Sequence, residues 1–207
     1  MKLLILGATG GTGRQLTLRA LEQQYEVTAL VRDPSKLAGS DNLVIIKGDA
    51  RDKETIIKAV EGKDAVLSCI GRGKSLHSQD LITAVMGNLL SAMEAQHLNR
   101  LIFLSAFGVG ETYKQANLLQ KIIFSTFLKN LYADKNKAEL LLHNSKLAWT
   151  LLYPVVLTNG PRTNNYRSAE KLPMKGMPKI SRADVAEQML CQLTDQRYIR
   201  KGIILSN

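Results

Sequence analysis

The chain has 207 residues, of which 45% are hydrophobic and 22% charged, which suits one well-cored domain and excludes two large ones. No apolar run reaches the roughly 18 residues of a membrane span, no signal peptide precedes the first apolar run, and the two cysteines lack metal-ligand spacing. With a net charge of +10 on scattered basic residues and only 5% aromatics, we expect a cytoplasmic protein without membrane or nucleic-acid contact, whose surface attracts anionic ligands.

The first predicted strand leads directly into a glycine-rich turn. The apolar run at residues 3–6 is followed by the sequence GATGGTG over residues 7–13 and then by apolar residues at helical spacing. A second strand over residues 26–31 completes a strand-helix-strand unit. The spacing GxxGxxG allows a tight turn, close approach to a pyrophosphate and close packing of helix on strand. The segment therefore predicts a dinucleotide site at the N-terminus of the first helix.

Strand and helix patterns continue to alternate through the first half of the chain. We predict strands at residues 43–47, 65–69 and 101–104, and helices at residues 53–60 and 80–96. This alternation is typical of an α/β fold with a doubly wound parallel sheet, here Rossmann-like and three-layered. We expect one domain over residues 1–207.

The second half begins with a long helical pattern at residues 113–143, with apolar residues along one side. A strand at residues 149–152 follows, and then a loop rich in Pro, Gly and Asn at residues 154–178. A further helix begins at Ser181, where Ser181 and Asp184 form a variant capping box, and a last strand covers residues 202–205. We expect the region 154–180 to cover a substrate.

Two adjacent residues after the second strand bear on the choice of cofactor. Arg32 occupies the position at which a guanidinium would bind a 2′-phosphate, so it favours NADP(H). Asp33, beside it, keeps NAD(H) possible because a carboxylate accepts hydrogen bonds from ribose hydroxyls. A solvated Arg32 without a ligand is the simpler alternative.

Three further strand ends carry candidate site residues. Asp49 follows the third strand, where it would accept from an adenine amino group or simply form a turn or helix cap. The segment at residues 68–75 resembles a nucleoside-triphosphate loop, but Ser68 stands where that motif requires glycine, so we expect Arg72 or Lys74 only to add positive charge. Ser105 ends the fifth strand, where it would orient a nicotinamide or a substrate.

Phe107, two residues after Ser105, is a candidate to stack on a flat ring. A serine at a strand end is equally often a turn former, which leaves both interpretations of Ser105 open.

The order of these motifs resembles the atypical short-chain dehydrogenase/reductase superfamily, in its NAD(P)H-binding, NmrA-like group. Within this group the chain is most similar to biliverdin reductase B and flavin reductase-like proteins. The glycine motif, Leu30-Val31-Arg32-Asp33, Gly48-Asp49 and Ser105-Ala106-Phe107 recur in the family's order. The motifs Glu139-Leu140-Leu141, Ala148-Trp149-Thr150 and Ile180-Ser181-Arg182-Ala183-Asp184 continue the resemblance.

Two departures from the family matter. If Lys135 is the lysine of the usual Tyr-xxx-Lys pair, Leu131 holds the tyrosine position and Tyr132 is one residue out of phase, a rotation of about 100° on a helix. Pro154 is followed by Val155 and Val156 where flavin reductases carry a histidine, which predicts an apolar pocket wall.

The resemblance implies an NAD(P)H-dependent reductase that transfers hydride to a flat conjugated acceptor such as free flavin, a bilin or a quinone. The alternative is an NmrA-like redox sensor that binds dinucleotide without turnover. We predict that Ser105 orients the reactants and is not an acid, with the proton supplied by solvent, and that Phe107 and Val156 contact the substrate. The residues predicted to bind the cofactor are Gly7, Thr9, Gly10, Gly11, Thr12, Gly13, Arg32, Asp49, Ala50, Cys69, Ile70, Gly71, Ser105, Ala106, Lys135, Pro154 and Val155.

Overall fold

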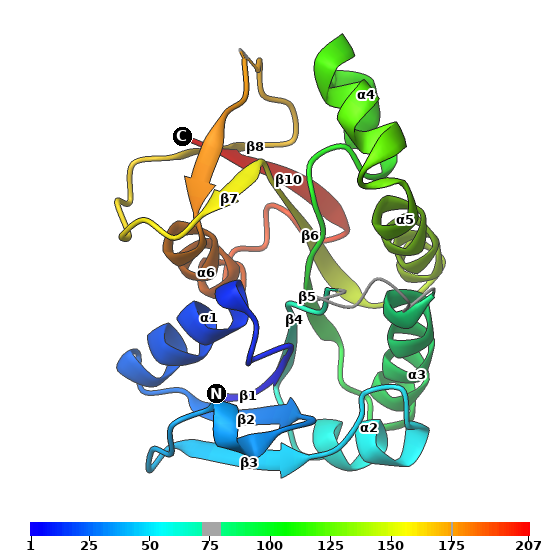
Figure 1. Cartoon of the computed structure of the whole chain (residues 1–207). Helices are drawn as coiled ribbons and strands as arrows, with labels where there is room; N and C mark the ends of the chain where they lie inside the picture. The colour runs from blue at the N-terminus through cyan, green and yellow to red at the C-terminus, as the bar shows by residue number, and fades with distance from the viewer. Residues whose placement is uncertain (72–79, 175) are drawn as a thin grey trace.

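A computed structural model describes residues 1–71, 80–174 and 176–207, and its main feature is an eight-stranded sheet in the order β3-β2-β1-β4-β5-β6-β10-β8 (Figure 1). All strands of this sheet are parallel except β8, which pairs antiparallel with β10. A separate parallel pair joins β7 to β9. The strands are β1 (Lys2–Leu6), β2 (Glu26–Val31), β3 (Leu43–Lys47), β4 (Ala65–Ser68), β5 (Arg100–Leu104), β6 (Ala148–Pro154), β7 (Val156–Thr158), β8 (Arg167–Ala169), β9 (Lys179–Ser181) and β10 (Lys201–Ser206).

Helices cover both faces of the sheet, so the predicted three-layer, doubly wound α/β fold is confirmed. On one face α1 packs against α6, and on the other α3 packs against α2 and α5 (Figure 1). The helices are α1 (Gly11–Glu22), α2 (Lys53–Val60), α3 (Leu81–Ala95), α4 (Leu118–Thr126), α5 (Lys129–His143) and α6 (Arg182–Cys191), with 3₁₀ turns η1 (Pro34–Lys36) and η2 (Gly110–Gln115).

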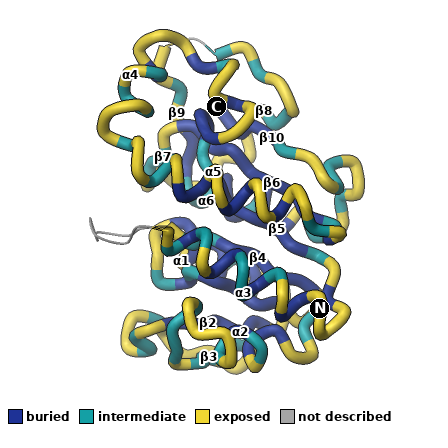
Figure 2. The backbone as a smooth tube through the Cα atoms, turned by 90° about the vertical axis from the view of Figure 1, so that its right-hand side faces the viewer, coloured by how far each residue is buried: buried dark blue, intermediate teal, exposed yellow. Residues whose placement is uncertain are grey.

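The core lies along the central strands, where the chain is buried in Figure 2. Leu3, Leu4, Ile5 and Leu6 of β1 have no exposed surface, because both faces of this strand are covered by helices. The sheet order reverses at β1, which pairs with β2 on one side and β4 on the other. Ligands of open α/β sheets bind at such a switch point, beyond the carboxyl ends of the strands.

The helix predicted over residues 113–143 is instead three shorter elements, η2, α4 and α5. A new helix starts at Asn117 because Asn117 and Gln120 form a capping box, each side chain binding the other's backbone N–H at 2.9 Å. Several apolar residues of this segment are exposed rather than buried: Leu118, Leu119, Ile122 and Phe127.

The predicted loop at residues 154–178 contains two short strands, β7 and β8. It is anchored to α6 by Asp184, whose carboxylate accepts from the backbone N–H groups of Thr163 at 2.8 Å and Asn164 at 2.9 Å. Ser181 caps α6 as predicted, accepting from the Asp184 N–H at 2.9 Å. Within the described residues, no helix is both long and apolar enough to span a membrane.

Candidate cofactor and active site

The glycine motif forms a tight turn between β1 and the first residue of α1. Gly7 has a φ of +79°, and a side chain there would place Cβ 2.7 Å from the carbonyl oxygen of Cys69, the residue after β4. A Cβ on Gly13 would overlap the carbonyl oxygen of Gly7, so α1 lies directly against the turn. This cradle leaves the N-terminus of α1 open to an anion, as a pyrophosphate requires.

A cavity of about 410 Å³ runs from this turn along the carboxyl ends of the strands. It brings together all the residues predicted to bind the cofactor except Pro154 and Val155. Those that line it are Gly7, Thr9, Gly10, Gly11, Thr12, Gly13, Arg32, Asp49, Ala50, Cys69, Ile70, Gly71, Ser105, Ala106 and Lys135.

At one end of the cavity, Arg32 and Asp33 have different environments. Arg32 lines the cavity, is exposed, and forms no ion pair with any described residue. Asp33 is bound to Ser35 and lies 2.9 Å from the Lys36 ammonium, contacts that lower its pKa to about 2, with the Ser35 hydroxyl the larger cause. The Asp33 carboxylate thus binds residues of its own turn, whereas the Arg32 guanidinium is accessible from the cavity.

Asp49 lies beside Arg32 but is bound to a neighbour. Both oxygens of its carboxylate accept hydrogen bonds from Arg51, one from the guanidinium at 2.6 Å and the other from the backbone N–H at 2.9 Å. These contacts hold the pKa of Asp49 below its ordinary value. The turn interpretation of Asp49 fits this geometry. The helix-cap interpretation does not, because Asp52 caps α2 by accepting from the Thr55 N–H at 2.8 Å.

The middle of the cavity is formed by the end of β4. Cys69 faces Met189, with their sulfurs 3.6 Å apart, and burial raises the pKa of the thiol to about 12, so it is not a nucleophile. The positive charges predicted at Arg72 and Lys74 lie outside the described residues.

Ser105 and Lys135 line the cavity from β5 and α5. The Lys135 ammonium donates to the Leu104 carbonyl oxygen at 2.8 Å and lies 5.2 Å from the centre of the Phe103 ring. Burial lowers its pKa to about 8. The Ser105 hydroxyl donates to the buried carboxyl of Glu139. The cavity therefore presents a hydroxyl and an amine on adjacent elements.

Tyr132 points away from this pair. Leu131 lines the cavity in its place, while the Tyr132 hydroxyl donates to the Phe107 carbonyl oxygen at 2.9 Å and its ring packs against Phe124. Burial raises the Tyr132 pKa to about 12. The helix register predicted for Leu131 and Lys135 matches this arrangement.

We therefore expect Tyr132→Phe to change turnover by far less than the roughly 10²-fold loss that removal of a general acid causes. Its main effect should be on stability, a loss of about 1 kcal/mol for the lost hydrogen bond to Phe107. Steady-state kinetics and urea unfolding of the two proteins measure both quantities. A hundredfold loss of turnover in a protein of unchanged stability would assign the acid to Tyr132 after all.

The structure places both predicted substrate residues outside the cavity wall. Phe107 is only 3% exposed, packs edge-on against Phe124, and is not part of the cavity wall. Its backbone N–H binds the Pro154 carbonyl oxygen at 3.0 Å, which turns it into the core. Val156 is exposed on β7, and because strand residues alternate in direction, its neighbour Leu157 lines the cavity instead.

Pro154 and Val155 also lie outside the cavity wall. Both are buried at the end of β6, where the Val155 N–H donates to the Leu205 carbonyl oxygen at 3.1 Å and continues the sheet. Their role is to hold β6 to β10 and to lead the chain toward Leu157.

Arg182 is a cavity residue that the sequence pattern did not single out. Its guanidinium occupies the space beside Gly11, 2.7 Å from where a Cβ would lie, and donates to the Asn159 side chain at 2.7 Å. No described carboxylate forms an ion pair with it. Gly11, the second of the two adjacent glycines, could have indicated this contact. A glycine that the GxxGxxG spacing does not require indicates that another group approaches the turn.

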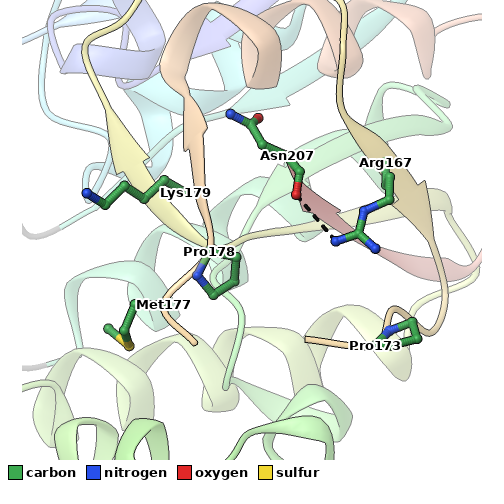
Figure 3. A pocket seen from close by; sticks show the side chains of 6 residues that line it. All are labelled: Arg167, Pro173, Met177, Pro178, Lys179 and Asn207. Atoms are coloured by element: carbon green, nitrogen blue, oxygen red, sulfur yellow. Dashed lines mark hydrogen bonds between the residues drawn. The ribbon is translucent and has the colours of Figure 1, made fainter. Parts of the chain in front are cut away.

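A second hollow, of about 640 Å³, lies between β8 and β9, lined by Arg167, Pro173, Met177, Pro178, Lys179 and Asn207 (Figure 3). Arg167 is turned toward the chain end, donating to the Asn207 carbonyl oxygen at 3.3 Å. None of the predicted site residues lies among the described residues that line it, so the cavity beside the glycine turn remains the candidate site.

Known proteins share the sequence pattern and the fold of this chain. The family model described as NAD(P)H-binding matches residues 7–196. YhfK of Bacillus subtilis, named as an uncharacterized sugar epimerase, is 26% identical over all of this chain and 94% of its own. ChuY, an anaerobilin reductase from Escherichia coli O157:H7, has a TM-score of 0.83 at 21% identity, covering 99% of this chain and 96% of its own.

A short-chain dehydrogenase/reductase from Veillonella parvula, solved in complex with NADP, has a TM-score of 0.81 at 20% identity, covering all of this chain and 94% of its own. These structural likenesses show a Rossmann fold, and the family model shows the family. The chain belongs to the NAD(P)H-binding family.

Proposed function

We propose that the protein is an NADPH-dependent reductase of a flat, conjugated acceptor such as free flavin, a bilin or a quinone. The observation that carries this proposal is one cavity that joins a glycine cradle to an apolar wall and contains Arg32 and Arg182, neither of which forms an ion pair with a described residue. The arginines suit a ligand with phosphates at two positions, and the wall suits an uncharged ring system.

The residues divide along the cavity by their chemistry. The N-terminus of α1 and Arg182 would hold the pyrophosphate, and Arg32 would hold the 2′-phosphate of NADPH. Bound NADPH supplies a hydride. Ser105 and Lys135 offer hydrogen bonds at the other end of the cavity, where Ile70, Leu81, Val85, Leu131 and Leu157 provide the apolar surface on which a planar acceptor would lie.

Names among the relatives support the reaction class. ChuY is an anaerobilin reductase, and an isoflavone reductase homologue from Zea mays is 30% identical over 52% of this chain. The competing function is an NmrA-like redox sensor, favoured by Leu131 at the position where a catalytic tyrosine would face the cavity.

NADPH absorbance, followed under anaerobic conditions with flavin mononucleotide, a bilin and a quinone in turn, tests the proposal. Anaerobic conditions prevent reoxidation of the reduced product by oxygen, so one NADPH is consumed for each acceptor reduced. We expect steady oxidation with at least one acceptor. Tight NADPH binding without reduction of any of the three would reject the reductase and support the sensor.

A further inference from the structure

A buried carboxyl lies behind the cavity wall at Ser105. Glu139 of α5 is only 2% exposed, and each of its oxygens has one hydroxyl donor. The Ser105 hydroxyl donates to Oε1, and the Tyr153 hydroxyl donates to Oε2 at 2.9 Å. Gly110 closes the far side, since a Cβ there would lie 2.6 Å from Oε2. Ser105 is therefore the link between this carboxyl and the cavity.

The charges around Glu139 leave it without an ion-pair partner. Burial raises its pKa above the ordinary glutamate value, and nearby Glu111 raises it further, while the two hydroxyl donors and Lys135 act in the opposite direction. Lys135 donates to the Leu104 carbonyl oxygen, and within the described chain no cation lies within ion-pair distance of Glu139. Burial without an ion pair therefore favours the neutral acid more than it is favoured in an exposed glutamate.

Tyr153 determines which oxygen carries the acidic proton. Burial, together with Glu139, raises the phenol pKa above its ordinary value, so Tyr153 stays protonated and donates to Oε2. In the neutral acid the proton would therefore lie on Oε1, and the Ser105 hydroxyl, which donates to Oε1 of the carboxylate, would become the acceptor. When that proton is donated to Ser105 Oγ, the serine hydrogen is free to point into the cavity.

We propose that Glu139 and Ser105 form a proton relay that protonates the acceptor during reduction, a role that rests on the proposed function. Reduction of the acceptor requires a hydride, which brings the electron pair, and one proton. Ser105 releases its hydroxyl proton to a heteroatom of the acceptor as its oxygen takes the proton of Glu139. The O–H bond of Glu139 breaks, an acceptor–H bond forms, and the resulting carboxylate is reprotonated from solvent.

The first test needs no cofactor or acceptor. In protein labelled with ¹³C at the glutamate carboxyls, the resonance that disappears in Glu139→Gln identifies this group. We expect it to titrate above the ordinary glutamate range, and to titrate still higher in Tyr153→Phe, which removes a hydrogen bond to the carboxylate. Titration within or below the ordinary range would overturn the relay, whatever the reductase assay shows.

The second test compares kinetics in the acceptor assay. Glu139→Gln and Ser105→Ala should each lower turnover by about 10²-fold, the usual contribution of a positioned acid. Glu139→Gln should leave NADPH affinity within about twofold, because Glu139 does not line the cavity. Turnover of the parent should fall as pH rises through the pKa measured by NMR, because the acid must be protonated. That limb of the pH profile should vanish in Glu139→Gln, and the pKa of Lys135 should fall in this variant, because the charge of Glu139 raises it.

The outcomes separate the two proposals. A parent protein that reduces no acceptor rejects the proposed function, while the NMR titration still decides whether Glu139 is a neutral acid. A parent that reduces an acceptor, with Glu139→Gln retaining its rate and pH profile within about threefold, rejects the relay alone. Ser105→Ala with normal turnover would show that Glu139 does not act through the serine.

Discussion

Replacing Gly13 by alanine should destabilise the protein by about 3 kcal/mol and weaken NADPH binding at least about tenfold. The added Cβ would overlap the carbonyl oxygen of Gly7, and neither atom can turn aside, because the backbone fixes the positions of both. Relief of this overlap requires α1 to move away from the turn after β1. The helix N-terminus would then no longer face the pyrophosphate position.

Thermal unfolding and NADPH titration measure the two effects, with a fall in Tm of about 6–12 °C expected for a chain of this size. Gly87→Ala is the matched control, because Gly87 lies within α3 and a Cβ there meets nothing within 4 Å. Helix propensity predicts that this change stabilises by about 0.5–1 kcal/mol. Equal behaviour of the two variants would show that the close approach at Gly13 does not constrain the turn.

The central sheet could be predicted from the sequence because its strands are buried on both faces. A continuous apolar run such as that of β1 between a glycine turn and a helical pattern has few alternatives, and the predicted bounds of β2, β3 and α2 match the structure. Residues at the carboxyl ends of parallel strands meet at one edge, which is why the predicted cofactor residues share a cavity.

The second half was less predictable because its structure depends on long-range contacts. The N-terminus of α3 is capped by Asp134 of α5, which accepts from the backbone N–H groups of Ile82 and Thr83 at 2.9 Å. Because the partners lie about 50 residues apart in the sequence, no local sequence pattern indicates this contact. The partners of Glu139 come from β5 and β6, so its burial could not be read from its own helix, where it looks like an ordinary polar residue.

Phe107 shows a similar limit. Its position two residues beyond Ser105 indicated the cavity, but the direction of its side chain is set by packing against Phe124, which belongs to a helix that the sequence pattern did not separate from its neighbours. Burial in such a cluster stabilises an aromatic side chain more than exposure at the wall of an empty cavity does. Strand-end position therefore identifies the region of a site, and tertiary packing selects its residues.

Arg32→Ala should lower NADPH affinity about 10- to 100-fold and leave NADH affinity within about twofold, so that most of the preference disappears. A guanidinium bound to a phosphate contributes about 1.5–3 kcal/mol. Arg32 lines the cavity and forms no ion pair with a described carboxylate, since Asp33 is bound to Ser35 and Lys36, and Asp49 to Arg51. Fluorescence titration with NADPH and NADH measures the two affinities, and comparing the affinities for 2′,5′-ADP and 5′-AMP isolates the contribution of the 2′-phosphate.

The control is Lys47→Ala, which removes an equal charge at the end of neighbouring β3. This variant tests general electrostatics and should leave the ratio of NADPH to NADH affinity unchanged. Equal affinities of the unmodified protein for NADPH and NADH would reject the assignment of Arg32, because its position would then confer no preference.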